Sequence, residues 1–152
     1  MKMKTINLCV TLLAILAASS ALAQTAVTGA GAANFASGAA LNGVSLNSMR
    51  FGIGVDIAVD GTATGSFQST LSGASRKIVI EGNVTRGSAT ALTPPVFSGT
   101  CTVDLGDGTT TTGVPFAVTL TKNASGVWTL ALTVGSTSLP NAAVSAGSIT
   151  AQ

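Results

Sequence analysis

The chain has 152 residues, of which 46% are hydrophobic, 8% are charged and none is histidine or tyrosine. The absence of imidazole removes the commonest general base and excludes Ser-His-Asp and Cys-His catalytic sites. Because Cys9 and Cys101 are the only cysteines, zinc and copper sites are implausible as well. The composition therefore predicts no catalytic residue, no cofactor and no metal site.

Residues 1–23 have the pattern of a cleavable signal peptide. Lys2 and Lys4 precede an apolar run over 8–18, and Ala21-Leu22-Ala23 forms an A-x-A cleavage site. The apolar run is too short to span a bilayer, which disfavours the alternative of an uncleaved membrane anchor. We therefore expect a secreted or periplasmic protein of a bacterial-type envelope, without a membrane span after processing.

Removal of this leader would also remove the net charge. The leader contains two of the seven Lys and Arg residues and none of the five Asp and Glu residues, so five basic and five acidic side chains would remain. A chain with no net charge gives no support to nucleic acid or an anionic membrane as a partner. Its sparse charge favours self-association or a partner in the envelope.

Residues 24–47 give a weak structural signal, because Ala and Gly dominate them. We expect a weakly structured N-terminal segment with a possible first strand over 34–40, followed by a single β domain over 48–152. The domain starts with a clear pattern. Large apolar side chains occupy every odd position from Phe51 to Val59, which predicts a strand with one buried face.

The first hairpin is predicted over 49–71. A three-residue loop, Val59-Asp60-Gly61, with Gly61 in the left-handed conformation, pairs Ile53 with Phe67 and keeps the apolar side chains on one face. A two-residue loop would split this apolar set between the two faces. In the chosen register the solvent-facing side chains are Arg50, Asp56, Thr64, Ser66 and Gln68.

Further strands are predicted over 77–86, 96–105 and 144–151, with loops over 87–95 and 136–141. Two hairpins lie between residues 96 and 134. A type I′ turn at Asp107-Gly108 would pair Cys101 with Val114. A three-residue loop at 124–126 would pair Leu120 with Leu130. It would also place the Lys122 stem beside Trp128 at one end of the core.

The sum of these elements is an all-β fold of about eight antiparallel strands, joined mostly in sequence. Such strands close on themselves or stack as two sheets, because open edges favour aggregation. We expect an up-and-down barrel, with a two-sheet β-sandwich as the alternative. The stretch Asp60-Gly61…Gly65-Ser66-Phe67 resembles a hairpin of the avidin family of eight-stranded barrels. That family reads its ligand with several Trp and with Tyr, so the resemblance does not carry biotin binding to this chain, which has one Trp and no Tyr.

Three groups of side chains are candidate sites. Asp104-Leu105-Gly106-Asp107-Gly108 resembles a calcium loop in composition but lacks the alternating ligands and terminal Glu of an EF-hand, so we expect Asp107 in a turn. Nothing brings Asp56, Asp60 and Glu81 together as a carboxylate pair. Cys101 is in phase with inward residues and should be a buried thiol, the alternative being an intermolecular disulfide or a reactive thiol.

The function expected from the sequence is that of an exported, non-enzymatic β domain with a structural or interaction role at the cell envelope or outside the cell. The alternative is a small-molecule carrier for an apolar ligand, since an eight-stranded barrel can enclose one small ligand. Four small residues are expected to face inward: Gly52, Gly65, Gly82 and Gly99. They either leave room for a ligand inside the barrel or relieve strand curvature. A weakly active enzyme is a third alternative.

Overall fold

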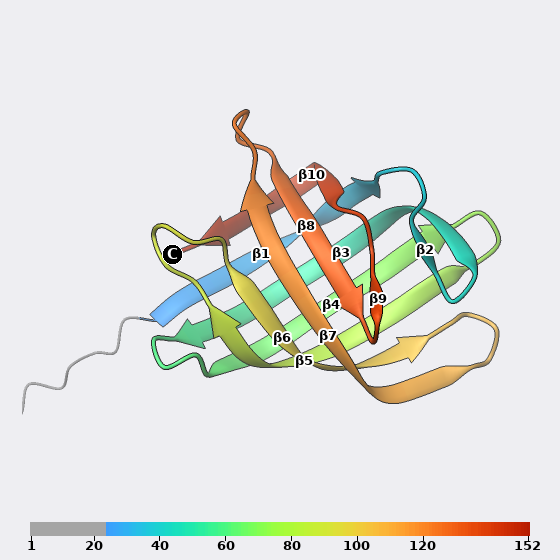
Figure 1. The fold of residues 1–152 in the computed structure, drawn as a ribbon, viewed down its shortest axis with the longest axis horizontal. Coiled ribbons are helices and arrows are strands. Elements are labelled where there is room, and N and C mark those ends of the chain that lie inside the picture. Colours follow the sequence, from blue (N-terminus) through green and yellow to red (C-terminus); the bar gives the residue numbers. More distant parts are fainter. Residues whose placement is uncertain (1–23) are drawn as a thin grey trace, which may run out of the picture.

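The computed structural model describes residues 24–152, so the expected signal peptide lies outside the described residues. Every regular element in this part of the chain is a β-strand, as expected, and the strands wrap into one ring (Figure 1). The bounds are β1 Gln24–Phe35, β2 Ala40–Leu41, β3 Val44–Ala58, β4 Ala63–Gly73, β5 Lys77–Ser88, β6 Val96–Asp104, β7 Thr110–Lys122, β8 Trp128–Val134, β9 Thr137–Ser138 and β10 Ala142–Ala151.

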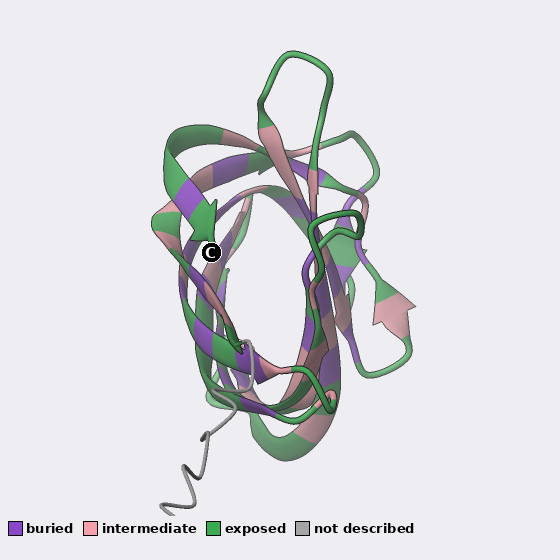
Figure 2. Cartoon of the chain, turned by 90° about the vertical axis from the view of Figure 1, so that its left-hand side faces the viewer, coloured by how far each residue is buried: buried purple, intermediate pink, exposed green. Residues whose placement is uncertain are grey.

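The ring is an up-and-down antiparallel barrel rather than a sandwich. The sheet order is β1-β10-β8-β7-β6-β5-β4-β3, and an additional β1–β3 pairing closes it, while the short strands β2 and β9 pair with β3 and β8. Figure 2 views the ring from one end, with buried positions alternating with exposed ones along the strands. This alternation is what one buried face requires of a strand.

The first strand differs from the prediction. β1 runs over Gln24–Phe35, so the expected strand over 34–40 is wrong, and the barrel includes most of the segment expected to be weakly structured. β1 pairs with β3 on one edge and with β10 on the other. A Cβ on Gly29 would lie 2.7 Å from the carbonyl oxygen of Ser148, and one on Gly31 would collide with that of Ala146. The small residues that weakened the sequence signal therefore allow close backbone approach.

The first and last predicted hairpin registers are confirmed. β3 and β4 pair Ile53 with Phe67 across a three-residue loop in which Gly61 has φ +85°. β7 and β8 pair Leu120 with Leu130 and Lys122 with Trp128. In both hairpins a correct turn length places the large apolar side chains of the strands on the inner face.

The β6–β7 turn differs from the predicted type I′ turn. Cys101 pairs with Val114 as expected, but beyond them the register shifts, and the N–H of Leu105 donates to the carbonyl of Thr109 at 3.0 Å. The loop is therefore three residues, Gly106-Asp107-Gly108, of which only the glycines have positive φ. β7 has a β-bulge near Gly113, where φ is +70°. The extra residue of the bulge compensates for the longer loop, so Cys101 still pairs with Val114.

Large side chains fill the middle of the barrel. Phe67 on β4 stacks on Phe116 on β7 with ring centroids 5.8 Å apart, and Phe97 on β6 lies 6.0 Å from Phe67. The ring of Phe116 also occupies the space beside Gly82, where a Cβ would lie 2.7 Å from it. A Cβ on Gly65 or Gly99 would collide with the neighbouring strand. The expectation that Gly52 faces inward is wrong, because Gly52 lies between the buried Phe51 and Ile53 of β3 and is on the outer face, where a Cβ has nothing within 4 Å. The glycines therefore do not make the interior hollow.

One end of the barrel, which we call the closed end, is covered by the segment between β1 and β3. Leu41 on β2 is 2% exposed and faces Val103, Val114 and Val134 across a cavity of about 190 Å³. The N–H of Leu46 donates to the carbonyl of Ala39 at 2.8 Å, which folds the segment back over the strands. Apolar burial thus continues from the interior to this end.

Candidate functional site

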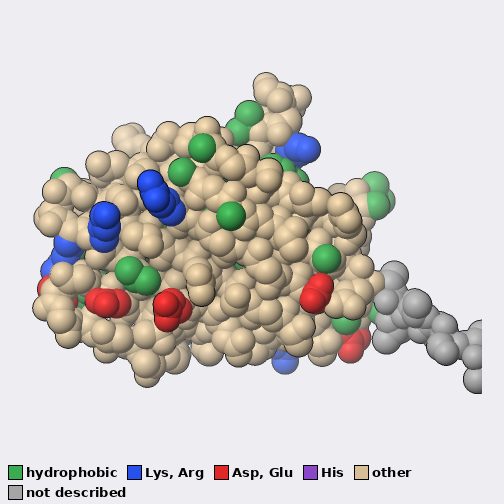
Figure 3. Space-filling model, turned by 180° about the vertical axis from the view of Figure 1, so that it is seen from behind, with side chains coloured by type: hydrophobic (Ala, Val, Ile, Leu, Met, Phe, Trp, Pro, Cys, Tyr) green, Lys and Arg blue, Asp and Glu red, His purple; other side chains and the backbone are tan. Residues whose placement is uncertain are grey.

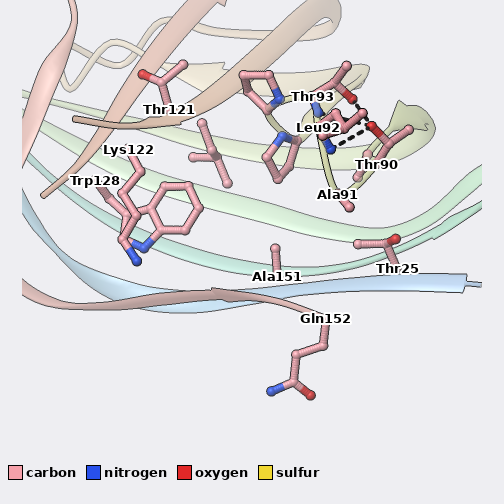
Figure 4. A pocket seen from close by; sticks show the side chains of 14 residues that line it. Thr25, Thr90, Ala91, Leu92, Thr93, Thr121, Lys122, Trp128, Ala151 and Gln152 are labelled. Atoms are coloured by element: carbon pink, nitrogen blue, oxygen red, sulfur yellow. Dashed lines mark hydrogen bonds between the residues drawn. The ribbon is translucent and has the colours of Figure 1, made fainter. Parts of the chain in front are cut away.

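The opposite end, which we call the open end, carries a hollow between the strand ends and the β5–β6 loop. This end cavity has a volume of about 690 Å³. Its walls are the ends of β1 and β10, the end of β7 with the start of β8, and the β5–β6 loop (Figure 4). The lining residues are Thr25, the segment 89–95, Leu120, Thr121, Lys122, Trp128, Ala151 and Gln152.

The β5–β6 loop over 89–95 forms one wall and has its own hydrogen bonds. The hydroxyl oxygen of Thr90 accepts from the N–H of Leu92 at 3.2 Å and from that of Thr93 at 3.0 Å. The carbonyl of Pro95 accepts from the N–H of Leu120 at 2.9 Å, which attaches the loop to β7. Leu92, at the tip, is 95% exposed. Pro94, Pro95 and these hydrogen bonds restrict the conformations of the loop. The loop forms a wall of the cavity and does not cover it.

Trp128 and Lys122 form the opposite wall. The Lys122 Nζ lies 5.3 Å from the centroid of the Trp128 ring, which is a cation–π contact and confirms the predicted proximity. Trp128 packs against the core and is half-buried, while Leu120 beside it is fully buried. The indole therefore lies at the barrel end, as expected, but lines the end cavity instead of filling it.

The end cavity borders a gap in the barrel wall. β8 and β10 share only two residue pairs, Ala142 with Leu130 and Ala143 with Thr129. Beyond them β10 continues to Ala151, paired with β1 alone. Within residues 24–152, the edge of 144–151 that faces away from β1 has no backbone hydrogen-bond partner. We call this the free edge.

The groups that point from the free edge can be assigned from the β1–β10 register. Ala26 and Gln152 exchange two backbone hydrogen bonds, at 2.8 and 3.0 Å. Residues of an antiparallel pair alternate between bonding to the partner and pointing away from it. The N–H and C=O groups of Gly147, Ile149 and Ala151 therefore point toward the free edge. Six of the eight residues over 144–151 are exposed.

The predicted acidic residues do not form a common site. Asp60 and Asp107 each serve a turn, because their Oδ1 atoms accept from the N–H of Thr62 and Thr109, both at 2.9 Å. Hydrogen bonds from Thr62 lower the pKa of Asp60, and hydrogen bonds from Thr109 lower the pKa of Asp107. Asp107 also forms an ion pair with Arg76 at 2.5 Å. The described residues contain no group of three His, Cys, Asp or Glu side chains placed to hold a metal.

The remaining acidic residues and the thiol are also separate. Asp56 on β3 and Glu81 on β5 are exposed on strands with β4 between them, and Asp104 caps its own loop by accepting from the N–H of Gly106 at 2.8 Å. Cys101 is 3% exposed, as predicted, and burial raises the pKa of its thiol. It lies inside the barrel and does not reach the end cavity.

Sequence reasoning missed the end cavity and the free edge. It predicts the Lys122–Trp128 proximity and the loop over 87–95 separately, but nothing local indicates that they face each other. Comparison of the chain with protein-family models, curated proteins and solved structures gave no match. In residues 24–152 there is no helix with the length and hydropathy needed to cross a membrane.

Proposed function

We propose that the chain is an exported, non-enzymatic β-barrel protein with an interaction role at the cell envelope or outside the cell, and that it binds a second copy of itself through the free edge of β10. The observation that carries this proposal is the unpaired edge of residues 144–151, which pair with β1 alone. Unpaired N–H and C=O groups on a strand edge are a template for pairing with another strand.

The composition of the edge supports this partner. Natural proteins protect exposed edges with Lys, Pro or inward-pointing charges, and the segment 142–152 contains neither proline nor any charged residue. Two such edges can approach without repulsion between like charges. The wider surface is similar: Figure 3 shows charged side chains of both signs scattered over one face, with no large area of one sign.

A two-fold arrangement fits the edge. Two copies of β10 aligned antiparallel would each present the same surface, as an isologous dimer requires. The pairing would extend from about residue 146 to 151, because a bulge at Ser145 in the β1–β10 ladder interrupts the regular edge. The alternating groups of Gly147, Ile149 and Ala151 would supply the hydrogen bonds.

Sedimentation velocity of the protein purified from the periplasm or medium of an expressing host tests the proposal. We expect a monomer–dimer equilibrium that the double substitution Ala146→Lys/Ser148→Lys shifts to monomer, because it adds like charges beside the edge. Gln68→Lys is the matched control, since Gln68 is exposed on β4, where both edges are paired. A monomer at every concentration, or a dimer indifferent to the edge substitutions, would contradict the proposal.

The same preparation tests export. N-terminal sequencing should give Gln24 as the first residue if the leader is removed at the A-x-A site. A chain that retains residues 1–23 in the membrane fraction would instead favour the anchor alternative.

A second candidate function is a small-molecule carrier. The specific observation that favours it is the end cavity, whose volume of about 690 Å³ lies within the range of small-molecule sites. The ligand would sit at the barrel mouth, because aromatic side chains fill the middle. Titration of candidate ligands against the emission of Trp128, the only tryptophan in the chain, tests this function.

A further inference from the structure

We infer that the end cavity binds a small organic anion with a planar apolar body, an inference that rests on the carrier function proposed above. Three properties of the cavity carry it: its apolar walls, its single charged side chain, and the small number of polar groups left free inside it.

The walls are apolar where they are most buried. Leu120 is fully buried at the base of the cavity and Pro95 beside it is buried, while the half-buried ring of Trp128 forms one side. The loop and β10 add the side chains of Ala91, Leu92 and Ala151. A planar apolar body would remove the exposed surfaces of Trp128, Leu92 and Ala151 from water and lie against an aromatic ring, both of which favour binding.

The charge of the ligand follows from Lys122, whose ammonium is the one charged side-chain group among the lining residues. Within residues 24–152 the only ion pair is Arg76–Asp107, which involves the β6–β7 loop at the closed end, so the Lys122 ammonium has no carboxylate partner. Its contact with the Trp128 ring holds it at the cavity wall. A ligand carboxylate could therefore form a charge-assisted hydrogen bond with it while the apolar body enters the cavity.

The polar groups argue against a sugar or a nucleotide. The Thr90 and Thr93 hydroxyls bond to each other at 2.7 Å, and the Thr121 hydroxyl bonds to that of Thr129, which leaves the Thr25 hydroxyl as the one lining hydroxyl without a side-chain partner within residues 24–152. Figure 4 shows the Gln152 side chain pointing away from the other labelled residues. A ligand rich in hydroxyl groups would leave most of its own donors unpaired in this cavity, at a cost in affinity.

The test compares naphthalene-2-carboxylate with its neutral isostere naphthalene-2-carboxamide. Both are titrated into the purified protein, with Trp128 emission and the thermal midpoint as readouts. We expect the carboxylate to bind about tenfold more tightly than the amide, the difference that one charge-assisted hydrogen bond gives. Lys122→Met should abolish this preference, because it keeps an apolar stem beside the indole and removes the charge.

Two further variants locate the binding. Lys77→Met removes an exposed lysine of β5 at the closed end and should leave both affinities unchanged. Ala151→Phe should weaken both ligands, because Figure 4 shows the Ala151 side chain directed into the cavity and a phenyl group would fill it. Unchanged affinities in Ala151→Phe would place the ligand elsewhere and overturn the inference.

The outcomes distinguish a failure of the anion preference from a failure of the carrier function. Equal binding of both compounds, lost in Ala151→Phe and unaffected by Lys122→Met, would overturn the preference for anions and keep a carrier. No change in emission or thermal midpoint with either compound at millimolar concentration would overturn the anion site and count against the carrier as well. Neither result bears on dimer formation through the free edge.

Discussion

The two ends of this barrel are built on the same eight strands and differ in what covers them and in the gap between β8 and β10, which lies at the open end. At the closed end, the segment between β1 and β3 turns inward and buries Leu41 to 2% exposure. At the open end, the β5–β6 loop is held beside the strands by its own hydrogen bonds and leaves Leu92 95% exposed. Space for a ligand is therefore a property of the connections, while the paired strands supply a rigid frame.

The largest difference between the ends should appear on truncation of one leucine at each. Leu41→Ala should lower the free energy of unfolding by about 2–4 kcal/mol, because it removes a buried side chain and leaves a cavity. Leu92→Ala should change it by less than about 0.5 kcal/mol, since the side chain is in solvent. Urea denaturation of both variants measures this. Similar losses in the two variants would mean that the open end is also covered.

A smaller effect is expected from the tight β3–β4 turn, which shows that the open end is not loose throughout. Gly61→Val should destabilise the protein by about 1–2 kcal/mol, because Gly61 has φ +85° and a β-branched residue is strained there. Gly52→Ala is the control, since a Cβ at Gly52 meets nothing within 4 Å. Thermal unfolding distinguishes the two. An unchanged midpoint for Gly61→Val would contradict the left-handed turn.

The ion pair at the closed end should contribute less. Arg76→Ala should cost at most about 1 kcal/mol, because both side chains are about one third exposed, 31% and 33%, and solvent screens such pairs. Unfolding in low and high salt checks this, since the loss should shrink as ionic strength rises. A loss above 2 kcal/mol would show that the Arg76 side chain has a packing role beyond the ion pair.

The smallest effect concerns pH and should have the same sign at the two ends. Hydrogen bonds lower the pKa of Asp60 at the open end and of Asp107 at the closed end below the usual 3.8. Each therefore adds stability above pH 3.8 that is lost as the pH falls through the lowered pKa. The thermal midpoint should be flat from pH 7 to about 5 and fall below 4. Asp60→Asn and Asp107→Asn should each reduce that fall, and a fall beginning near pH 6 would contradict this assignment.

How much of the fold follows from sequence depends on the size of the alternating side chains. In β3 every second residue from Met49 to Ile57 is large and apolar, and β4 has large apolar residues at Phe67 and Leu71. Only one register buries Ile53 against Phe67, and that register is observed. In β1 the alternating positions hold mostly Ala and Gly, so hydrophobic periodicity is weak although the strand is fully paired. Strands whose backbones approach closely need small residues. Small residues give little hydrophobic periodicity, which is the signal by which a strand is recognised in a sequence.

The β6–β7 turn and the end cavity show two further limits. The apolar phase predicted the correct partner for Cys101, yet a longer loop and a compensating bulge give the same pairing, and phase alone does not separate the two. The contact of Lys122 with Trp128 followed from a hairpin register. The end cavity instead depends on where the β5–β6 loop lies and how far β10 diverges from β8, which are tertiary properties.

The position of β1 has a consequence for how the chain folds. Successive hairpins can form the run from β3 to β8, but joining β1 to β10 brings Val27 beside Ala151, from opposite ends of the described chain. Contacts between residues so distant in sequence form slowly, because the long loop must first be closed. We expect ring closure to limit the rate, with refolding in about milliseconds to seconds. Stopped-flow refolding complete within microseconds would exclude that order of events.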